Sequence, residues 1–109
     1  MNLNKIFTNS NRWIKNGRAK YRDGSSASFC IKYGEKQKEP WAFSLHGAIS
    51  FFTDQETDLR SKTMGLVSKA ISIYSGRDMF VAEFNDSPDT SFDDITAVIK
   101  IYNKLKDDR

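Results

Sequence analysis

Apolar residues recur at helical spacing in four stretches of the chain, and this pattern predicts four helices. The first is expected over about residues 2–15 and the second over about residues 40–52. The third follows a capping pattern at 53–56, and the fourth follows a similar pattern at 90–93. In each pattern a hydroxyl precedes a carboxylate by three residues, so that the two side chains can satisfy open backbone donors.

The stretch 40–52 is the most apolar part of the chain and is expected to lie at the centre of the fold. Pro40 suits the first turn of a helix, because no backbone donor is missed there. Apolar side chains fall on more than one side of this predicted helix, which is typical of a buried helix. Gly17, in the left-handed conformation, and Gly76 are placed to end the first and third helices.

Three segments between the predicted helices lack a helical period. Residues 17–39 are expected to form an irregular connection with at most a small hairpin, and residues 85–89 have the composition of a turn. The short apolar run 79–84 fits either a buried strand or a helical turn. We therefore expect a mainly α fold, with about four helices in a single compact domain over residues 1–109.

The length of 109 residues is sufficient for one core and too short for two. No apolar run approaches the roughly 20 residues that span a bilayer, and the first residues lack the apolar segment of a signal peptide. The single Cys30 excludes an internal disulfide and suits a reducing compartment. These features predict a cytoplasmic protein that does not contact the membrane.

The formal net charge of +3 hides an asymmetry, because residues 1–38 carry +7 and the remaining residues carry −4. An anionic partner for the first third is one interpretation. The alternative is that the two parts complement each other, either within one fold or across a homo-oligomer.

Three fragments resemble one known pattern: residues 13–19 followed by Asp23-Gly24, residues 41–49, and residues 84–90. Together they resemble the domain of unknown function 6197, a family of small uncharacterised bacterial and phage proteins. The chain has Phe84 where that pattern has a Trp before Asn-Asp. The resemblance implies a mainly helical fold and no known activity, and the Lys- and Asn-rich composition is similar to that of phage accessory proteins.

His46, the only histidine, is a candidate general base if Asp86 or Glu83 lies beside it. The alternative is a hydrogen-bonded core histidine. His46 and Cys30 do not make up the roughly four ligands of a structural zinc site, so no metal is expected. Asn85, Asp86 and Asp89 are candidate Mg²⁺ ligands or acceptors for a ribose or base. The alternative is that they hold a turn while residues 90–93 cap the last helix.

A basic segment over residues 12–22 combines cations with the flat side chains of Trp13 and Tyr21, which suits a phosphate-bearing ligand. The alternative is a solvated helix end with Trp13 turned into the core. The chain has no P-loop and no G-x-G-x-x-G, so no ordinary nucleotide cradle is expected. It has no helix-turn-helix or zinc-finger spacing, so a sequence-reading DNA module is not expected either.

The leading hypothesis is a non-enzymatic binding protein of a phage-encoded accessory or anti-defence type. It would sequester or block an anionic target, either a nucleotide or a nucleic-acid-associated host protein, and it needs no cofactor. A second hypothesis is an inhibitor of a basic protein that acts through the acidic C-terminal half, and a third is a small hydrolase that uses His46 and Asp86. The candidate ligand-binding residues are Arg12, Trp13, Lys15, Arg18, Lys20, Trp41, His46, Asn85 and Asp86. If Gly47 leaves a groove beside His46, the segments 13–22 and 85–86 are expected to close over it.

Overall fold

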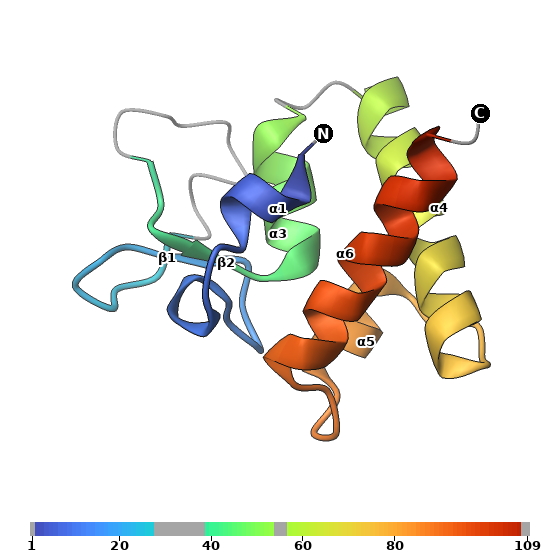
Figure 1. Ribbon diagram of the computed structural model, residues 1–109. Helices are drawn as coiled ribbons and strands as arrows, with labels where there is room; N and C mark the ends of the chain where they lie inside the picture. Colours follow the sequence, from blue (N-terminus) through green and yellow to red (C-terminus); the bar gives the residue numbers. More distant parts are fainter. Residues whose placement is uncertain (1, 28–38, 54–56, 108–109) are drawn as a thin grey trace.

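The computed structural model describes residues 2–27, 39–53 and 57–107, and within them the chain is mainly helical (Figure 1). The elements, in chain order, are α1 (Leu3–Ile6), the 3₁₀ helix η1 (Ser10–Arg12), β1 (Ala19–Lys20), β2 (Ala42–Phe43), α3 (Leu45–Phe52), α4 (Thr57–Ser75), α5 (Val81–Asp86) and α6 (Phe92–Asp107). Their buried apolar side chains form one continuous core cluster. The expected mainly α fold is confirmed.

The two long helices α4 and α6 lie side by side and form one half of the molecule (Figure 1). Along α6 the apolar residues repeat every three or four positions, so that one face is buried. The buried residues of this face are Ile95, Val98, Ile99 and Tyr102. α4 ends at Ser75, and Gly76 follows with a φ of 78°. The predicted helical face of α6 and the predicted stop at Gly76 are therefore confirmed.

The central helix α3 begins at Leu45, five residues later than the sequence predicts. Ser44 caps it, because its Oγ accepts a hydrogen bond from the Gly47 N–H at 3.0 Å. Ala42–Phe43 form the strand β2 instead, and the Trp41 N–H before it donates to the Lys20 carbonyl at 2.9 Å. Pairing with another segment thus replaces the first helical turn that Pro40 was expected to begin.

The prediction of a first helix over residues 2–15 is wrong beyond Ile6. The polar run Thr8-Asn9-Ser10-Asn11 interrupts it, because such side chains bond to nearby backbone and compete with a helix. Asn9 Oδ1 accepts from the Asn11 N–H at 2.9 Å and starts η1. The left-handed residue that follows is Asn16, with a φ of 60°, and not Gly17.

In the segment predicted to be irregular, β1 pairs antiparallel with the distant β2, with Ala19 opposite Phe43 and Lys20 opposite Ala42. After β1 the chain turns back on itself, so that the Ala27 N–H donates to the Ala19 carbonyl at 2.9 Å. Gly24, with a φ of 91°, lies in the turn between them. The remainder of this segment up to residue 38, with Cys30 in it, lies outside the described residues.

The ambiguous run 79–84 is helical from Val81 onward, and Asn85 and Asp86 form the last turn of α5 and not a separate turn. The tight turn comes after them, where the Thr90 N–H donates to the Ser87 carbonyl at 3.1 Å. The cap of α6 lies one residue later than predicted. The Ser91 N–H donates to Asp94 Oδ2 at 2.8 Å, so Ser91 and Asp94 take the roles expected of Thr90 and Asp93.

The first residue of the predicted capping pattern at 53–56 does not start a helix. Thr53 ends α3, and its Oγ1 donates to the Ile49 carbonyl at 2.8 Å. The other three residues of the pattern lie outside the described residues.

None of the helices in the described ranges has the length and the apolar composition of a membrane-spanning segment.

Candidate functional site

Asn85 is fully buried and joins three segments that are far apart in the sequence. Its Oδ1 accepts from the Trp13 indole N–H at 2.7 Å and from the Leu45 N–H at 2.9 Å. Its Nδ2 donates to the Ile14 carbonyl at 3.0 Å and to Asp86 Oδ1 at 2.9 Å. All the ordinary hydrogen-bonding capacity of one amide is therefore used. We call this arrangement the Asn85 junction: Trp13, Ile14, Leu45, Asn85 and Asp86.

Two further contacts fasten the segment after Trp13 to the end of α5. Asp86 Oδ1 accepts from the Asn16 N–H at 2.8 Å, which holds Asn16 in its left-handed conformation. Lys15 Nζ donates to the Ser87 carbonyl at 2.7 Å. Asp86 and Lys15 thus have internal partners, and their positions are explained without a ligand.

Gly47 lies against the backbone of the segment that precedes β1. A Cβ atom built on Gly47 would lie 2.0 Å from the Arg18 carbonyl oxygen. The same carbonyl accepts from the Ser44 N–H at 3.0 Å. The hypothesis of an open groove at Gly47 is therefore wrong, because the Arg18 backbone fills that space. Parts of the segments 13–22 and 85–86 do lie beside α3, because the Arg18 carbonyl packs against Gly47 and Asn85 bonds to the Leu45 N–H, but they close over no groove.

His46 is half-buried beside the Asn85 junction. Its Nε2 lies 3.3 Å from Ser44 Oγ, and its Nδ1 is buried with no hydrogen-bond partner among the described residues. Burial lowers the pKa of His46 below its ordinary value of 6.5, Asp86 opposes this effect and Arg18 adds to it. The imidazole is therefore held neutral near pH 7. Ser44 is fully buried, so its hydroxyl does not face solvent as a nucleophile would.

Trp41 forms a second site on the edge of the small sheet. Its backbone is fixed on both sides, because its N–H donates to Lys20 and its carbonyl accepts from Arg12 Nε. The Cζ atom of Arg12 lies 5.0 Å from the centroid of the indole, and that of Arg22 lies 5.9 Å from it. Both distances are within the range of cation–π attraction. We call Trp41 with Arg12, Lys20 and Arg22 the Trp41 platform.

The structure therefore separates the nine predicted binding residues into two groups. Trp13 is half-buried and packs against the core, because its N–H is bonded to Asn85 and its ring centroid lies 6.2 Å from that of Phe92. The residues at or beside the junction are Trp13, Lys15, His46, Asn85 and Asp86, and those at or beside β1 and β2 are Arg12, Arg18, Lys20 and Trp41. Arg22 is an additional member of the second group. Its only signal in the sequence is its place in the basic segment.

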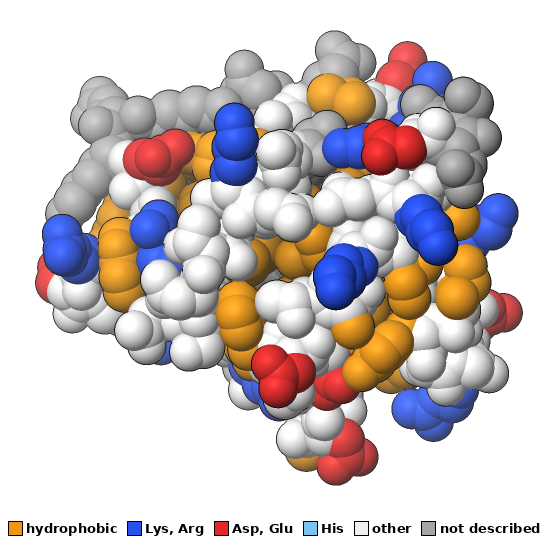
Figure 2. All heavy atoms as spheres, viewed as in Figure 1, with side chains coloured by type: hydrophobic (Ala, Val, Ile, Leu, Met, Phe, Trp, Pro, Cys, Tyr) orange, Lys and Arg blue, Asp and Glu red, His pale blue; other side chains and the backbone are white. Residues whose placement is uncertain are grey.

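Figure 2 shows how charge is distributed on one face of the molecule. Lysine and arginine side chains lie on the side of β1 and β2, and others lie over α4 and α6. Acidic side chains gather at the lower edge, where the chain turns into α6. Two of the acidic residues near this turn have internal partners: Asp86 accepts from Asn16, and Asp94 accepts from Ser91. Across the described ranges, no three His, Cys, Asp or Glu side chains come together as a metal site.

Comparisons of the chain with protein-family models, with curated proteins and with solved structures found no match. The resemblance to the domain of unknown function 6197 therefore remains a prediction. What the chain does has to be argued from the two sites themselves.

Proposed function

We propose that the chain is a non-enzymatic binding protein that holds an anionic ligand on the Trp41 platform. The ligand class is a nucleotide, or the nucleotide-like part of a nucleic-acid-associated target, which the protein sequesters or blocks. The observation that carries the proposal is the pair of guanidinium groups over one fixed indole. Guanidinium groups bind phosphate oxygens in a planar fork, and an indole stacks on a base.

The local charge supports an anionic ligand. The segment 12–22 contains five basic and no acidic side chains. Lys20 and Arg22 are exposed, and Arg18 is exposed just before β1. Such a concentration of one sign raises the local concentration of anions. Trp13, which the sequence also offered as a stacking surface, is bonded to Asn85, so Trp41 is the better candidate for that role.

The two other hypotheses receive less support from the geometry. An inhibitor that meets a basic protein would use the acidic lower edge, but Asp86 and Asp94 are already bonded within the chain. A hydrolase would need a reactive group beside His46, and Ser44 is buried there. Both remain outcomes that the following experiment separates from nucleotide binding.

The test is a thermal-shift panel of mono-, di- and cyclic nucleotides and a short single-stranded oligonucleotide. A ligand that binds only the folded state raises the unfolding temperature. We expect a shift that falls steeply with added salt, because phosphate contacts release counterions. Arg22→Gln should reduce the shift, whereas Lys62→Gln, at an exposed position on α4, should leave it unchanged.

Tryptophan fluorescence distinguishes the two indoles. Quenching by the ligand should persist in Trp13→Phe and disappear in Trp41→Leu, because Trp41 is the indole that lies under the two guanidinium groups of Arg12 and Arg22. No shift with any member of the panel, or a shift that is insensitive to Arg22→Gln, would contradict the proposal.

A further inference from the structure

Phe80 has 82% of its surface exposed, more than the other large hydrophobic side chains in the described part of the chain. It also occupies the N-cap position of α5, where its side chain makes no capping bond. Ser, Thr, Asp and Asn are preferred at this position. A phenyl ring that stays exposed contributes no hydrophobic free energy to folding. The fold of a single chain therefore does not account for this residue.

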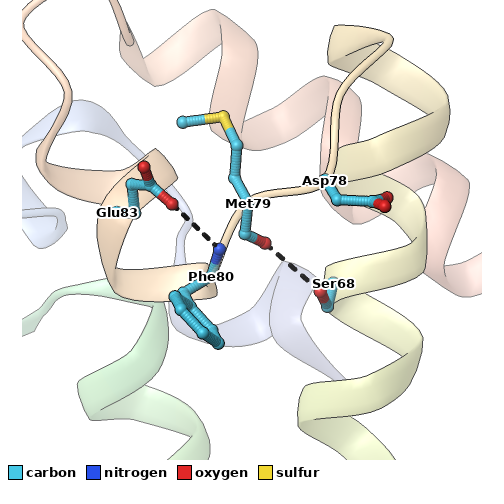
Figure 3. A pocket seen from close by; sticks show the side chains of 5 residues that line it. All are labelled: Ser68, Asp78, Met79, Phe80 and Glu83. Atoms are coloured by element: carbon cyan, nitrogen blue, oxygen red, sulfur yellow. Dashed lines mark hydrogen bonds between the residues drawn. The ribbon is translucent and has the colours of Figure 1, made fainter.

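The backbone around Phe80 is held firmly, as Figure 3 shows. The Ser68 hydroxyl on α4 donates to the Met79 carbonyl at 3.2 Å, and the Phe80 N–H donates to Glu83 Oε1 at 3.3 Å. The Ser72 hydroxyl donates to Asp78 Oδ1 at 2.9 Å. The ring points away from the side chains of Met79 and Glu83. The exposed ring is therefore carried by a fixed backbone, which is typical of an anchor residue in a protein interface.

An apolar hollow that can receive such a ring lies elsewhere on the same molecule. It has a volume of about 330 Å³ and is lined by Asn2, Lys5, Ile6, Phe52 and Leu59, from α1, the end of α3 and the start of α4. Phe52 and Leu59 are 40% and 46% exposed. The Phe52 ring is fixed as a wall, because its centroid lies 5.3 Å from that of Phe43 and 5.0 Å from that of Phe51.

The surroundings of the ring and of the hollow are complementary in charge. Asp78 and Glu83 lie beside Phe80, and Lys5 carries the charge among the described residues that line the hollow. Opposite charges at the edge of an apolar contact favour the matching orientation and disfavour others. The same chain thus carries both halves of one contact.

The two surfaces face different directions, so one molecule does not satisfy its own ring. Leu59, at the hollow, and Ser68, beside Phe80, are nine residues apart on α4. At 1.5 Å and about 100° per residue, they are separated by about 14 Å along the helix and about half a turn around it. A contact between ring and hollow must therefore join two molecules head to tail.

We propose that a second copy of this chain places its Phe80 ring in the hollow between α1 and the start of α4. The carboxylates of Asp78 and Glu83 then lie near Lys5 of the receiving molecule. The dimer keeps an unused hollow on one molecule and an unused ring on the other, so association continues beyond the dimer as the concentration rises. The contact is small, which places it among weak and transient interfaces.

Sedimentation velocity over a concentration series tests the proposal. The average mass of the wild-type chain should rise with concentration, and Phe80→Ser should remain monomeric. Serine is a preferred N-cap residue, so this variant should fold at least as well as the wild type. Leu59→Glu should also remain monomeric, because it places a carboxylate where those of Asp78 and Glu83 arrive. Ile73→Asp is the matched control, since Ile73 is 56% exposed and lies in neither surface, and it should associate like the wild type.

A mixing experiment then tests the head-to-tail geometry. Phe80→Ser retains an intact hollow, and Leu59→Glu retains an intact ring. An equimolar mixture should therefore form a one-to-one dimer and stop there. Three outcomes would overturn the proposal: a wild-type chain that remains monomeric up to about 1 mM, a concentration well suited to weak interfaces; a Phe80→Ser variant that associates normally; or a mixture that does not dimerise.

Discussion

The side-chain amide of Asn85 holds the indole of Trp13, with Asn85 Oδ1 accepting from the indole N–H at 2.7 Å across 72 positions of sequence. The same oxygen accepts from the Leu45 N–H at 2.9 Å, at the start of α3. One buried amide thus determines where the N-terminal segment lies relative to α3 and α5. The Trp41 platform depends on this placement, because Arg12 directly precedes Trp13.

Replacement of Asn85 by alanine should be strongly destabilising. It would leave buried backbone and indole donors without partners, and each such group costs about 1–3 kcal/mol. We expect a total loss of about 2–4 kcal/mol in the free energy of unfolding, measured with urea. Asn103→Ala is the control, because Asn103 makes an exposed bond to Asn4 at 2.6 Å and should change stability by less than about 0.5 kcal/mol. Equal effects of the two substitutions would contradict the structural role of Asn85.

Gly47 and Gly65 form a matched pair for a second prediction. A Cβ on Gly47 would lie 2.0 Å from the Arg18 carbonyl oxygen, whereas a Cβ on Gly65, in α4, meets nothing within 4 Å. Gly47→Ala should therefore lose about 2–3 kcal/mol through overpacking. Gly65→Ala should gain about 0.5–1 kcal/mol through helix propensity.

Hydrogen exchange locates the effect of Gly47→Ala. The Ser44 amide is protected by its bond to the Arg18 carbonyl at 3.0 Å, so its exchange should accelerate in this variant. Unchanged protection of Ser44, together with unchanged stability, would show that the Arg18 backbone does not lie against Gly47.

The sequence predicts the long helices well because their information is local. The apolar stripe of α6 and the stop at Gly76 depend on spacing within one helix, and tertiary packing reinforces both. The first helix fails for a local reason as well. Its apolar spacing is correct for one turn, but the polar side chains of residues 8–11 bond to the backbone and end it.

The two candidate sites depend on contacts that have no local signature. Asn85 lies in a segment, residues 85–89, whose composition is typical of a turn. Its partners Trp13 and Leu45 lie 72 and 40 residues away in the sequence. The spacing of Trp41 from Leu45 and Ala48 is helical, yet its N–H donates to the Lys20 carbonyl. Periodicity identifies which side chains are apolar, whereas long-range backbone pairing decides where they lie.

A third prediction concerns the bond between Tyr74 and Asp94. The Tyr74 hydroxyl donates to Asp94 Oδ1 at 2.5 Å, which lowers the pKa of Asp94 below 3.8 and raises the pKa of Tyr74 above 10. In Tyr74→Phe, the pKa of Asp94 should therefore rise toward its ordinary value, as followed by carbon NMR of the carboxyl group. The aromatic ring and its contact with Phe84 are retained in this variant, so packing serves as the control.

The effect of this bond on stability has a definite sign. Because the pKa of Asp94 is lower in the folded chain than in the unfolded chain, its contribution is present above the ordinary pKa and is lost as the pH falls through the lowered value. Both groups are largely exposed, so the contribution is small. An Asp94 pKa that does not move in Tyr74→Phe would show that the bond is absent in solution.

The last prediction uses the single histidine of the chain. Burial lowers the pKa of His46 below 6.5 in the folded state, so the unfolded chain binds more protons as the pH falls through that value. The free energy of unfolding should therefore decrease as the pH is lowered from 7 toward 5. His46→Gln should show a flatter dependence in this window, because no other side-chain type has an ordinary pKa there.

Proton NMR of the imidazole measures the same quantity directly. The titration midpoint of His46 should lie below 6.5 in the folded chain and should fall further in Asp86→Asn, because the Asp86 carboxylate favours the charged imidazole. A midpoint at or above 6.5 would mean that His46 has a charged partner or an open environment. Such a result would favour the general-base hypothesis, because a general base needs the access that the buried Nδ1 of His46 lacks in this structure.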